Sequence, residues 1–222
     1  MKKPMVDYRQ FRLSQLNTPE FSHLKLLGGW IVYFILYFLT ENLIPPERCH
    51  IIHSALDDAI PFLEGFAIPY CFWYLLIVIS LLWLLLYDVD SFKKLQVYIM
   101  ITQAVAMLCY IVWPSMQDLR PTEFPRDNFL THIMAFIYQF DTPTGVCPSL
   151  HVAYSLGMAS VWCKCRKANV GWKVFVVAAA AVISIATAFV KQHSVVDIFA
   201  ALPLGVLAEV LTFYVIYPKK KQ

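Results

Sequence analysis

Long apolar stretches alternate with short polar segments along this chain of 222 residues. A membrane-spanning helix needs about 20 mostly apolar residues, and six segments reach or approach that length. These segments are residues 26–44, 66–87, 95–117, 142–163, 174–190 and 198–218. The pattern therefore predicts an all-α, polytopic membrane protein with six transmembrane helices.

Two of the polar connections are long, and both lie on the same side of the predicted spans. Residues 41–64 form the first and residues 114–148 the second. Within the second, between residues 127 and 140, aromatic and aliphatic side chains recur at helical spacing, and Asp127 is placed to act as the N-cap. We expect an extra amphipathic helix there, lying in the outer membrane interface.

The composition agrees with the pattern, since 59% of the residues are hydrophobic and only 15% are charged. An average soluble domain has roughly 45–50% apolar and about 25% charged residues. A soluble single domain, a disordered chain and a coiled coil are therefore excluded. No run of basic residues interleaved with aromatic residues indicates a nucleic-acid partner.

Basic residues predict the orientation, because they concentrate on cytoplasmic loops. With six spans, 14 of the 18 basic residues fall on the side that holds both termini. The other side has Arg48, Arg120, Arg126 and Lys191. We expect a cytoplasmic N-terminal segment (1–25), one membrane domain (26–218) and a basic cytoplasmic tail (219–222). Because residues 1–20 lack an apolar core, no cleavable signal is expected, and the cell membrane is the predicted location.

The few polar residues at the ends of the spans collect on the extracytoplasmic side. Topology places the following residues there at similar depth: Arg120, Ser149, Leu150, His151, Lys191, His193 and Asp197. Ionisable groups at membrane depth are costly and are functional candidates by default.

The chemistry of this group favours phosphoryl transfer without a metal or another cofactor. Asp197 follows His193 by four residues, so a helix that begins before His193 would place both on one face. A carboxylate that orients an imidazole raises the basicity of its other nitrogen, which suits His193 for the role of nucleophile or general base. His151 could then protonate a leaving oxygen.

Backbone and side-chain groups could bind the phosphate. Ser149, Leu150 and His151 begin a helix after a proline, and free N–H groups at a helix N-terminus form an anion site. Arg120 and Lys191 bring positive charge to the same place, and the fork of donors on an arginine suits a phosphate.

These residues resemble the motifs of the type-2 phosphatidic acid phosphatase superfamily, whose fold is shared with vanadium haloperoxidases. The family motifs are Lys-x6-Arg-Pro, Pro-Ser-Gly-His and Ser-Arg-x5-His-x3-Asp. Their counterparts are Arg120-Pro121, Pro148-Ser149-Leu150-His151 and His193-x3-Asp197, within a likeness that runs from about residue 61 to the end. The resemblance implies that His193 is a nucleophile oriented by Asp197, that His151 is the acid, and that Arg120 and Ser149 hold the phosphate.

Four positions depart from the family motifs. Trp113 stands where the first motif has lysine, Ala186-Thr187 replaces the Ser-Arg pair, and Leu150 replaces glycine. Lys191 is the candidate to supply the missing charge from another direction. The Ser-Leu-His sequence is similar to the branch that contains inositol phosphorylceramide synthases, which move a phosphoryl headgroup between lipids.

We therefore expect a membrane lipid phosphatase or phosphotransferase that works through a phosphohistidine. Its substrate would be a phospholipid or a polyprenyl or sphingolipid phosphate that enters sideways between helices. The acceptor, either water or an inositol- or ceramide-type alcohol, stays open. One alternative is a non-catalytic lipid-binding or transport protein on the same fold, and a third class is a serine hydrolase built on Ser149 and His193.

Other polar residues of the outer loops have less specific patterns. His50 and His53 could ligate a metal together with Asp57 and Asp58, although a solvated loop helix is the expected structure. The acidic residues of the second loop, Asp141 included, are expected to be loop residues, one of which could select the headgroup.

Two further expectations concern Glu209 and the cysteines. Glu209 lies in the cytoplasmic half of the last span and is expected to pair with a basic residue of the inner face. Cys49 and Cys147 both face outward in the predicted topology, so a bridge between them is conceivable.

Overall fold

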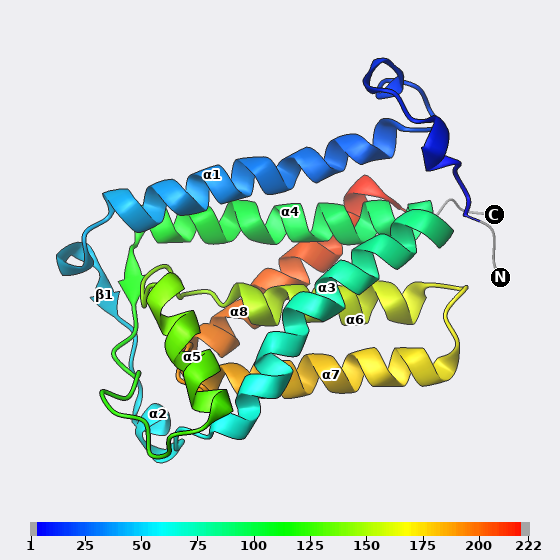
Figure 1. Ribbon diagram of the computed structural model, residues 1–222. Coiled ribbons are helices and arrows are strands. Elements are labelled where there is room, and N and C mark those ends of the chain that lie inside the picture. Colours follow the sequence, from blue (N-terminus) through cyan, green and yellow to red (C-terminus); the bar gives the residue numbers. More distant parts are fainter. Residues whose placement is uncertain (1–3, 219–222) are drawn as a thin grey trace.

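The computed structural model describes residues 4–218, which form a bundle of long helices (Figure 1). The long helices are α1 (Gly28–Leu43), α3 (Ala67–Tyr87), α4 (Val89–Val112), α6 (Leu150–Lys164), α7 (Val170–Phe189) and α8 (Val195–Val210). A π-helical segment, η6 (Leu211–Ile216), continues α8. The short elements are η1 (Tyr8–Gln10), η2 (Leu13–Gln15), η3 (Ser22–Leu27), η4 (Pro46–Arg48), β1 (His50–Ile51), α2 (Ala55–Ala59), η5 (Glu64–Phe66), β2 (Ser115–Met116) and α5 (Phe129–Phe140).

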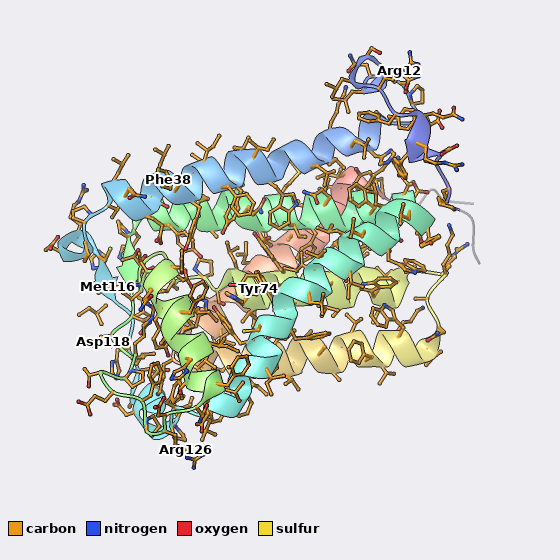
Figure 2. The ribbon with its side chains drawn as sticks, in the orientation of Figure 1. Arg12, Phe38, Tyr74, Met116, Asp118 and Arg126 are labelled. Atoms are coloured by element: carbon orange, nitrogen blue, oxygen red, sulfur yellow. The ribbon has the colours of Figure 1, made fainter. Side chains whose placement is uncertain are left out.

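Several of these helices have the length and composition of membrane spans. Five helical stretches of the described chain qualify: Ser22–Leu43, Glu64–Tyr87, Val89–Val112, Val170–Phe189 and Val195–Ile216. Their outward faces carry exposed apolar side chains such as Phe38, which points away from the bundle (Figure 2). The expected class, a helical multi-pass membrane protein, is confirmed by these helices. Helix α6 is shorter, with 15 residues.

Two predicted spans were too long, because loop residues were counted as part of a helix. The segment predicted over 95–117 ends as α4 at Val112, and Ser115–Met116 is strand β2. The segment predicted over 142–163 becomes helical only at Leu150. Several residues of these two loop stretches are buried against the rest of the protein, among them Ser115, Gln117 and Val146.

A small sheet also corrects the expectation of a purely α-helical fold. Strands β1 and β2 pair in parallel, with His50 opposite Ser115 and Ile51 opposite Met116. Met116 also bridges to Thr144, and the Gly145 N–H donates to the Ser115 carbonyl at 2.7 Å. Three segments of the two long connections, at residues 50–51, 115–116 and 144–145, are therefore joined at one end of the bundle.

Helix α6 lies at the centre of the bundle and packs against α4, α7 and α8. Close approach to α4 requires Gly157, because a Cβ atom there would lie 2.5 Å from the Tyr98 ring. The Tyr98 hydroxyl donates to the Gly205 carbonyl of α8 at 3.0 Å. The Trp162 ring N–H donates to Ser80 of α3 at 2.9 Å. The contacts of Gly157 and Trp162 hold the central helix against α4 and α3, and the Tyr98 hydroxyl joins α4 to α8.

Helix α1 lies at the periphery and packs on α4 (Figure 1). None of its residues is buried. At one end, Trp30 donates to Gln96 of α4 at 3.1 Å. At the other end, Tyr37 donates to Asp141 at 2.8 Å, and Glu41 accepts from Thr142 at 2.7 Å. Hydrogen bonds near both ends and the packing of Trp30, Tyr33 and Tyr37 against the core therefore attach α1.

Helix α5 covers the segment expected to be amphipathic. Its N-cap is Asn128, whose side chain accepts from the N–H groups of Leu130 at 2.9 Å and Thr131 at 3.1 Å. The prediction that Asp127 would cap this helix was wrong, because Asp127 contacts the His132 ring at 2.6 Å instead. The exposed aromatic residues of α5 are Phe129, Phe136 and Phe140.

The first and last described residues lie at one end of the bundle, and the joined loops lie at the other (Figure 1). At the end that holds the termini, Lys164 contacts Glu209 at 2.7 Å, which confirms the expected pair. The expected basic tail 219–222, together with Lys2 and Lys3, lies outside the described residues.

Candidate functional site

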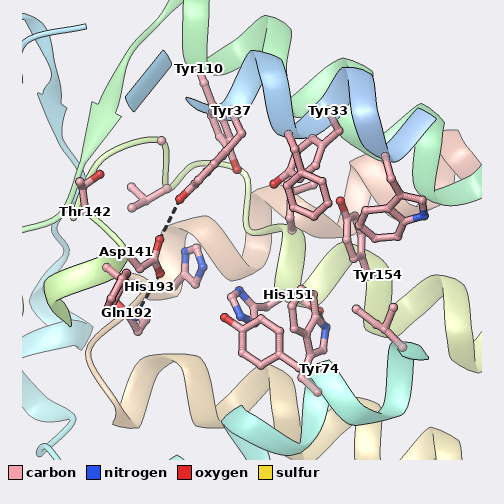
Figure 3. Close-up of a pocket in the computed structure, with 18 of the residues that line it drawn as sticks. Tyr33, Tyr37, Tyr74, Tyr110, Asp141, Thr142, His151, Tyr154, Gln192 and His193 are labelled. Carbon is pink, nitrogen blue, oxygen red and sulfur yellow. Dashed lines mark hydrogen bonds between the residues drawn. The ribbon is translucent and has the colours of Figure 1, made fainter. Parts of the chain in front are cut away.

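Two histidines from distant parts of the chain face each other at the loop end of the bundle. His151 is the second residue of α6, and His193 lies in the short connection between α7 and α8. Their ring centroids are 5.6 Å apart, and both side chains line one cavity (Figure 3). The spatial association expected from the sequence is therefore present.

The carboxylate of Asp197 orients the His193 ring. His193 Nδ1 lies 3.3 Å from Asp197 Oδ2, which also accepts the Ser194 N–H at 3.0 Å. Asp197 is fully buried. With the proton on Nδ1, Nε2 of His193 presents a lone pair, and no residue within 4–218 hydrogen-bonds to that Nε2.

A shared helical face for His193 and Asp197 required a helix that begins before His193, and the structure does not have one. Ser194 is the N-cap of α8 and the helix begins at Val195, so His193 precedes it. The His193–Asp197 pair forms across the N-cap residue Ser194, because the Asp197 side chain points back toward the start of α8.

Aromatic rings hold His151 in place. Its ring centroid lies 4.0 Å from that of Trp73 and 4.7 Å from that of Tyr70. The Trp73 ring N–H donates to the His151 carbonyl at 3.1 Å. Nε2 of His151 is buried and has no hydrogen-bond partner within residues 4–218. A buried polar atom without a partner is a candidate for ligand contact.

Ser149 is a buried helix cap. Its Oγ accepts the Val152 N–H at 3.5 Å, and its own N–H donates to the Asp197 carbonyl at 3.2 Å. Ser149 therefore attaches the start of α6 to α8. Because the side chain is fully buried and outside the cavity lining of the described residues, the serine hydrolase alternative lacks an accessible nucleophile.

The start of α6 leaves two backbone donors unused. Within residues 4–218, the N–H groups of Leu150 and His151 have no acceptor, as is normal for the first turn of a helix. Leu150 also lines the cavity. This helix start therefore has the features of an anion site.

Arg120 lies behind the cavity wall rather than in it. It donates to the carbonyls of Tyr138 and Thr142, each at 3.2 Å, and to Gln192 Oε1 at 2.6 Å. Its guanidinium also lies 4.6 Å from the centre of the Tyr138 ring. Burial lowers the pKa of Arg120, an effect opposed by the nearby Asp141 carboxylate. Arg120 is therefore linked to the cavity lining by its hydrogen bonds to Gln192 and to the Thr142 carbonyl.

Lys191 points away from the histidines. Its backbone has φ 54°, and its Nζ donates to the Asp57 carbonyl at 2.7 Å. Burial lowers the pKa of Lys191, against the attraction of Asp57 and Asp58. Among the described residues, neither Lys191 nor Arg120 lines the cavity.

Four residues without a specific predicted role join this network: Gln192, Asp141, Tyr70 and Tyr37. Gln192 donates to Asp141 Oδ2 at 3.2 Å and to the Tyr70 hydroxyl at 3.3 Å. Asp141 Oδ1 accepts the Tyr37 hydroxyl at 2.8 Å (Figure 3). Gln192 directly precedes His193, and this adjacency was the one sequence signal that could have identified it.

Asp57 fixes the connection that carries His193. Its Oδ2 accepts the Ser194 hydroxyl at 2.6 Å, and its Oδ1 accepts the Val195 N–H at 2.8 Å. Ser54 donates to the same carboxylate from both its N–H and its hydroxyl. Burial alone would raise the pKa of Asp57, but these hydrogen bonds together hold it below its ordinary value.

The burial of Asp57 corrects the prediction that this part of the first long connection is a solvated loop helix. It is 2% exposed on α2, because that short helix packs its acidic side chain under the start of α8. His53, beside it, contacts Asp118 at 2.7 Å and Asp58 at 2.9 Å, while His50 stacks on Trp113. Within residues 4–218, no group of three or more metal-ligating side chains is arranged to hold a metal ion.

The cavity has a volume of about 550 Å³ and lies between α1, α3 and the start of α6. Its polar end holds the two histidines, Asp141 and Gln192, and Tyr74 faces it from α3 (Figures 2 and 3). The other end is apolar and is lined by Phe34, Ile77, Val78 and Leu81. Cys49 and Cys147, for which a bridge was conceivable, are free thiols.

Comparisons with protein-family models, with curated proteins and with solved structures give no match to this chain.

Proposed function

We propose that this chain is an integral membrane lipid phosphatase or phosphotransferase. The observation that carries the proposal is the His193–Asp197 pair facing His151 across a cavity that is polar at one end and apolar at the other. A lipid would place its phosphate at the polar end and its chains at the apolar end.

The reaction would proceed in two displacements. His193 Nε2 attacks the phosphorus, and the bond from phosphorus to the leaving oxygen breaks as His151 gives that oxygen a proton. Water or an alcohol, deprotonated by His151, then attacks the phosphohistidine, and the phosphorus–nitrogen bond breaks. The N–H groups of Leu150 and His151 stabilise the charge on the phosphoryl oxygens.

The resemblance to the motifs of the type-2 phosphatidic acid phosphatase superfamily supports the same chemistry. We propose that the arrangement in the membrane is also similar. Helix α6 would complete six spans, with its ends near the two membrane surfaces. Both termini would be cytoplasmic, the histidines would be extracytoplasmic, and the exposed phenylalanines of α5 would enter the outer interface of the cell membrane.

Alanine at each histidine tests the proposal. Purified His193→Ala should lose phosphate release and headgroup transfer to background, and His151→Ala should lose about 10²–10⁴-fold in turnover because it removes the general acid. His132→Ala is the matched control, because that ring is exposed at the same end of the protein. Unchanged melting temperatures establish folding, and retained turnover in both site variants would overturn the mechanism.

Trapping the intermediate provides an independent measurement. A lipid labelled at the phosphorus should transfer label to the wild-type protein, and the label should be absent from His193→Ala. Adding inositol- or ceramide-type alcohols then separates hydrolysis from transfer, because only a transferase forms a labelled lipid product.

A non-catalytic lipid-binding protein is the second candidate. The observation that favours it is the engagement of Arg120 with protein acceptors, which leaves the cavity lining without a cation among the described residues. Lipid binding that is equal in wild type and His193→Ala, without vanadate-sensitive turnover of any phospholipid, would favour this candidate.

A further inference from the structure

The charges in the cavity differ from those expected for a strongly anionic ligand. Among the described residues that line it, Asp141 is the one acidic side chain. The lining contains no lysine or arginine. A phosphate monoester carries a charge of about −1.5 to −2 at neutral pH, whereas a phosphodiester carries a single negative charge. The cavity therefore disfavours the monoester.

Asp141 has no direct ion pair within residues 4–218. Its two oxygens accept from Tyr37 and Gln192, both neutral donors. Arg120 attracts it from behind Gln192, but the hydrogen bonds of Arg120 go to two carbonyls and to Gln192. Each carboxylate oxygen can accept more than one hydrogen bond, so Asp141 can also receive a donor from a ligand.

Aromatic rings line much of this cavity, and some of them lie at its polar end. The lining aromatic side chains include Trp30, Tyr33, Tyr37, Trp73, Tyr74 and Tyr110. Figure 3 shows Tyr37 beside Asp141, and Tyr74 beside His151. Aromatic faces attract ammonium groups, most strongly when both are shielded from water. A carboxylate next to aromatic rings is therefore suited to a positively charged amine.

We propose that the cavity takes a zwitterionic phosphodiester lipid, with an ammonium group in its headgroup. This inference rests on the proposed function. The phosphodiester lies between His193, His151 and the start of α6, while the ammonium group lies against Asp141 and the neighbouring tyrosines. The acyl chains leave between α1 and α3, where the lining is apolar.

A comparison of lipids with identical short acyl chains tests this inference. The probes are phosphatidylethanolamine, phosphatidylcholine, phosphatidylglycerol and phosphatidic acid, presented to the purified full chain in one detergent. We expect the highest kcat/KM for the ammonium-bearing diesters, a lower value for the glycerol diester and the lowest for the monoester. A preference for phosphatidic acid would overturn the inference while leaving the phosphatase proposal in place.

Asp141→Asn should shift this preference. Removing one partly shielded charge should reduce the ratio of ammonium to glycerol diester kcat/KM about tenfold, mainly through KM. Asp127→Asn, at an exposed carboxylate of the same loop, should leave the ratio unchanged. Tyr74→Leu should also reduce the ratio and Tyr74→Phe should preserve it, because phenylalanine keeps the aromatic face. An unchanged ratio in Asp141→Asn would contradict the proposal.

Binding to His193→Ala separates this inference from the proposed function. Displacement of a fluorescent lipid by the same four probes measures preference without turnover. A preference for ammonium-bearing diesters that is lost in His193→Ala/Asp141→Asn supports the inference even if no lipid is turned over. Equal displacement by all four probes overturns it.

Discussion

Asp57 shows how one buried side chain can position a reactive residue it does not touch. Its carboxylate holds Ser194 and Val195, the two residues that follow His193. Asp57→Ala should leave those buried donors unpaired and lower the free energy of unfolding by about 2–4 kcal/mol. Chemical denaturation of the purified protein measures the loss, and turnover should fall with it because the His193 connection loosens.

Asp58→Ala is the matched control, since the neighbouring Asp58 side chain is 70% exposed and exposed pairs contribute little. The lowered pKa of Asp57 also gives a pH dependence. Its stabilisation is complete above the ordinary carboxyl pKa of about 4 and is lost as the pH falls through the lower, folded value. Equal stability of both alanine variants would contradict this role.

Sequence reasoning could find part of this residue-level picture. His151, His193 and Asp197 were predictable because motif order and topology place them together. Asp57 and Asp141 were visible only as loop acids, since nothing in their spacing indicates that one packs under α8 and the other accepts from α1. Lys191 could not be placed, because its direction depends on the left-handed backbone at that residue.

At the scale of elements, the ends of α1 control its attachment beside the cavity. Tyr37 and Glu41 join its last turns to residues 141–144. Tyr37→Phe/Glu41→Gln should weaken these hydrogen bonds and reduce the free energy of unfolding by about 1–2 kcal/mol. Hydrogen exchange of the segment 141–149 should rise, because that segment loses its partners on α1.

Asn42→Ala on the same helix supplies the control, since Asn42 donates only within α1, to the Phe38 carbonyl at 2.7 Å. Faster hydrogen exchange of 141–149 in Asn42→Ala would show that the contacts of Tyr37 and Glu41 do not attach the helix. The absence of any increase in exchange in Tyr37→Phe/Glu41→Gln would show the same.

Apolar length located the six long helices, but it extended two of them into loops and began three of them three to six residues late. The segment 66–87 lies within a residue of α3 (Ala67–Tyr87), because polar residues bound that run on both sides. The segments 95–117 and 142–163 failed at their outer ends, where residues 113–117 and 142–149 are extended or looped. Local hydropathy cannot distinguish a residue buried by lipid from one buried by a neighbouring loop.

The whole molecule is polarised, with the described termini at one end and β1, α2 and α5 at the other (Figure 1). The basic residues divide in the same way, which predicts that the loop end is extracytoplasmic.

Glu123 is exposed at the loop end, and Cys163 is exposed at the end of α6 near the termini. A membrane-impermeant maleimide should therefore label Glu123→Cys in intact cells, in a Cys49→Ser background. Cys163 should react only after the cells are permeabilised. Labelling of Cys163 in intact cells would reverse the orientation and place His151 and His193 on the cytoplasmic side, where the substrate lipid would have to come from the inner leaflet.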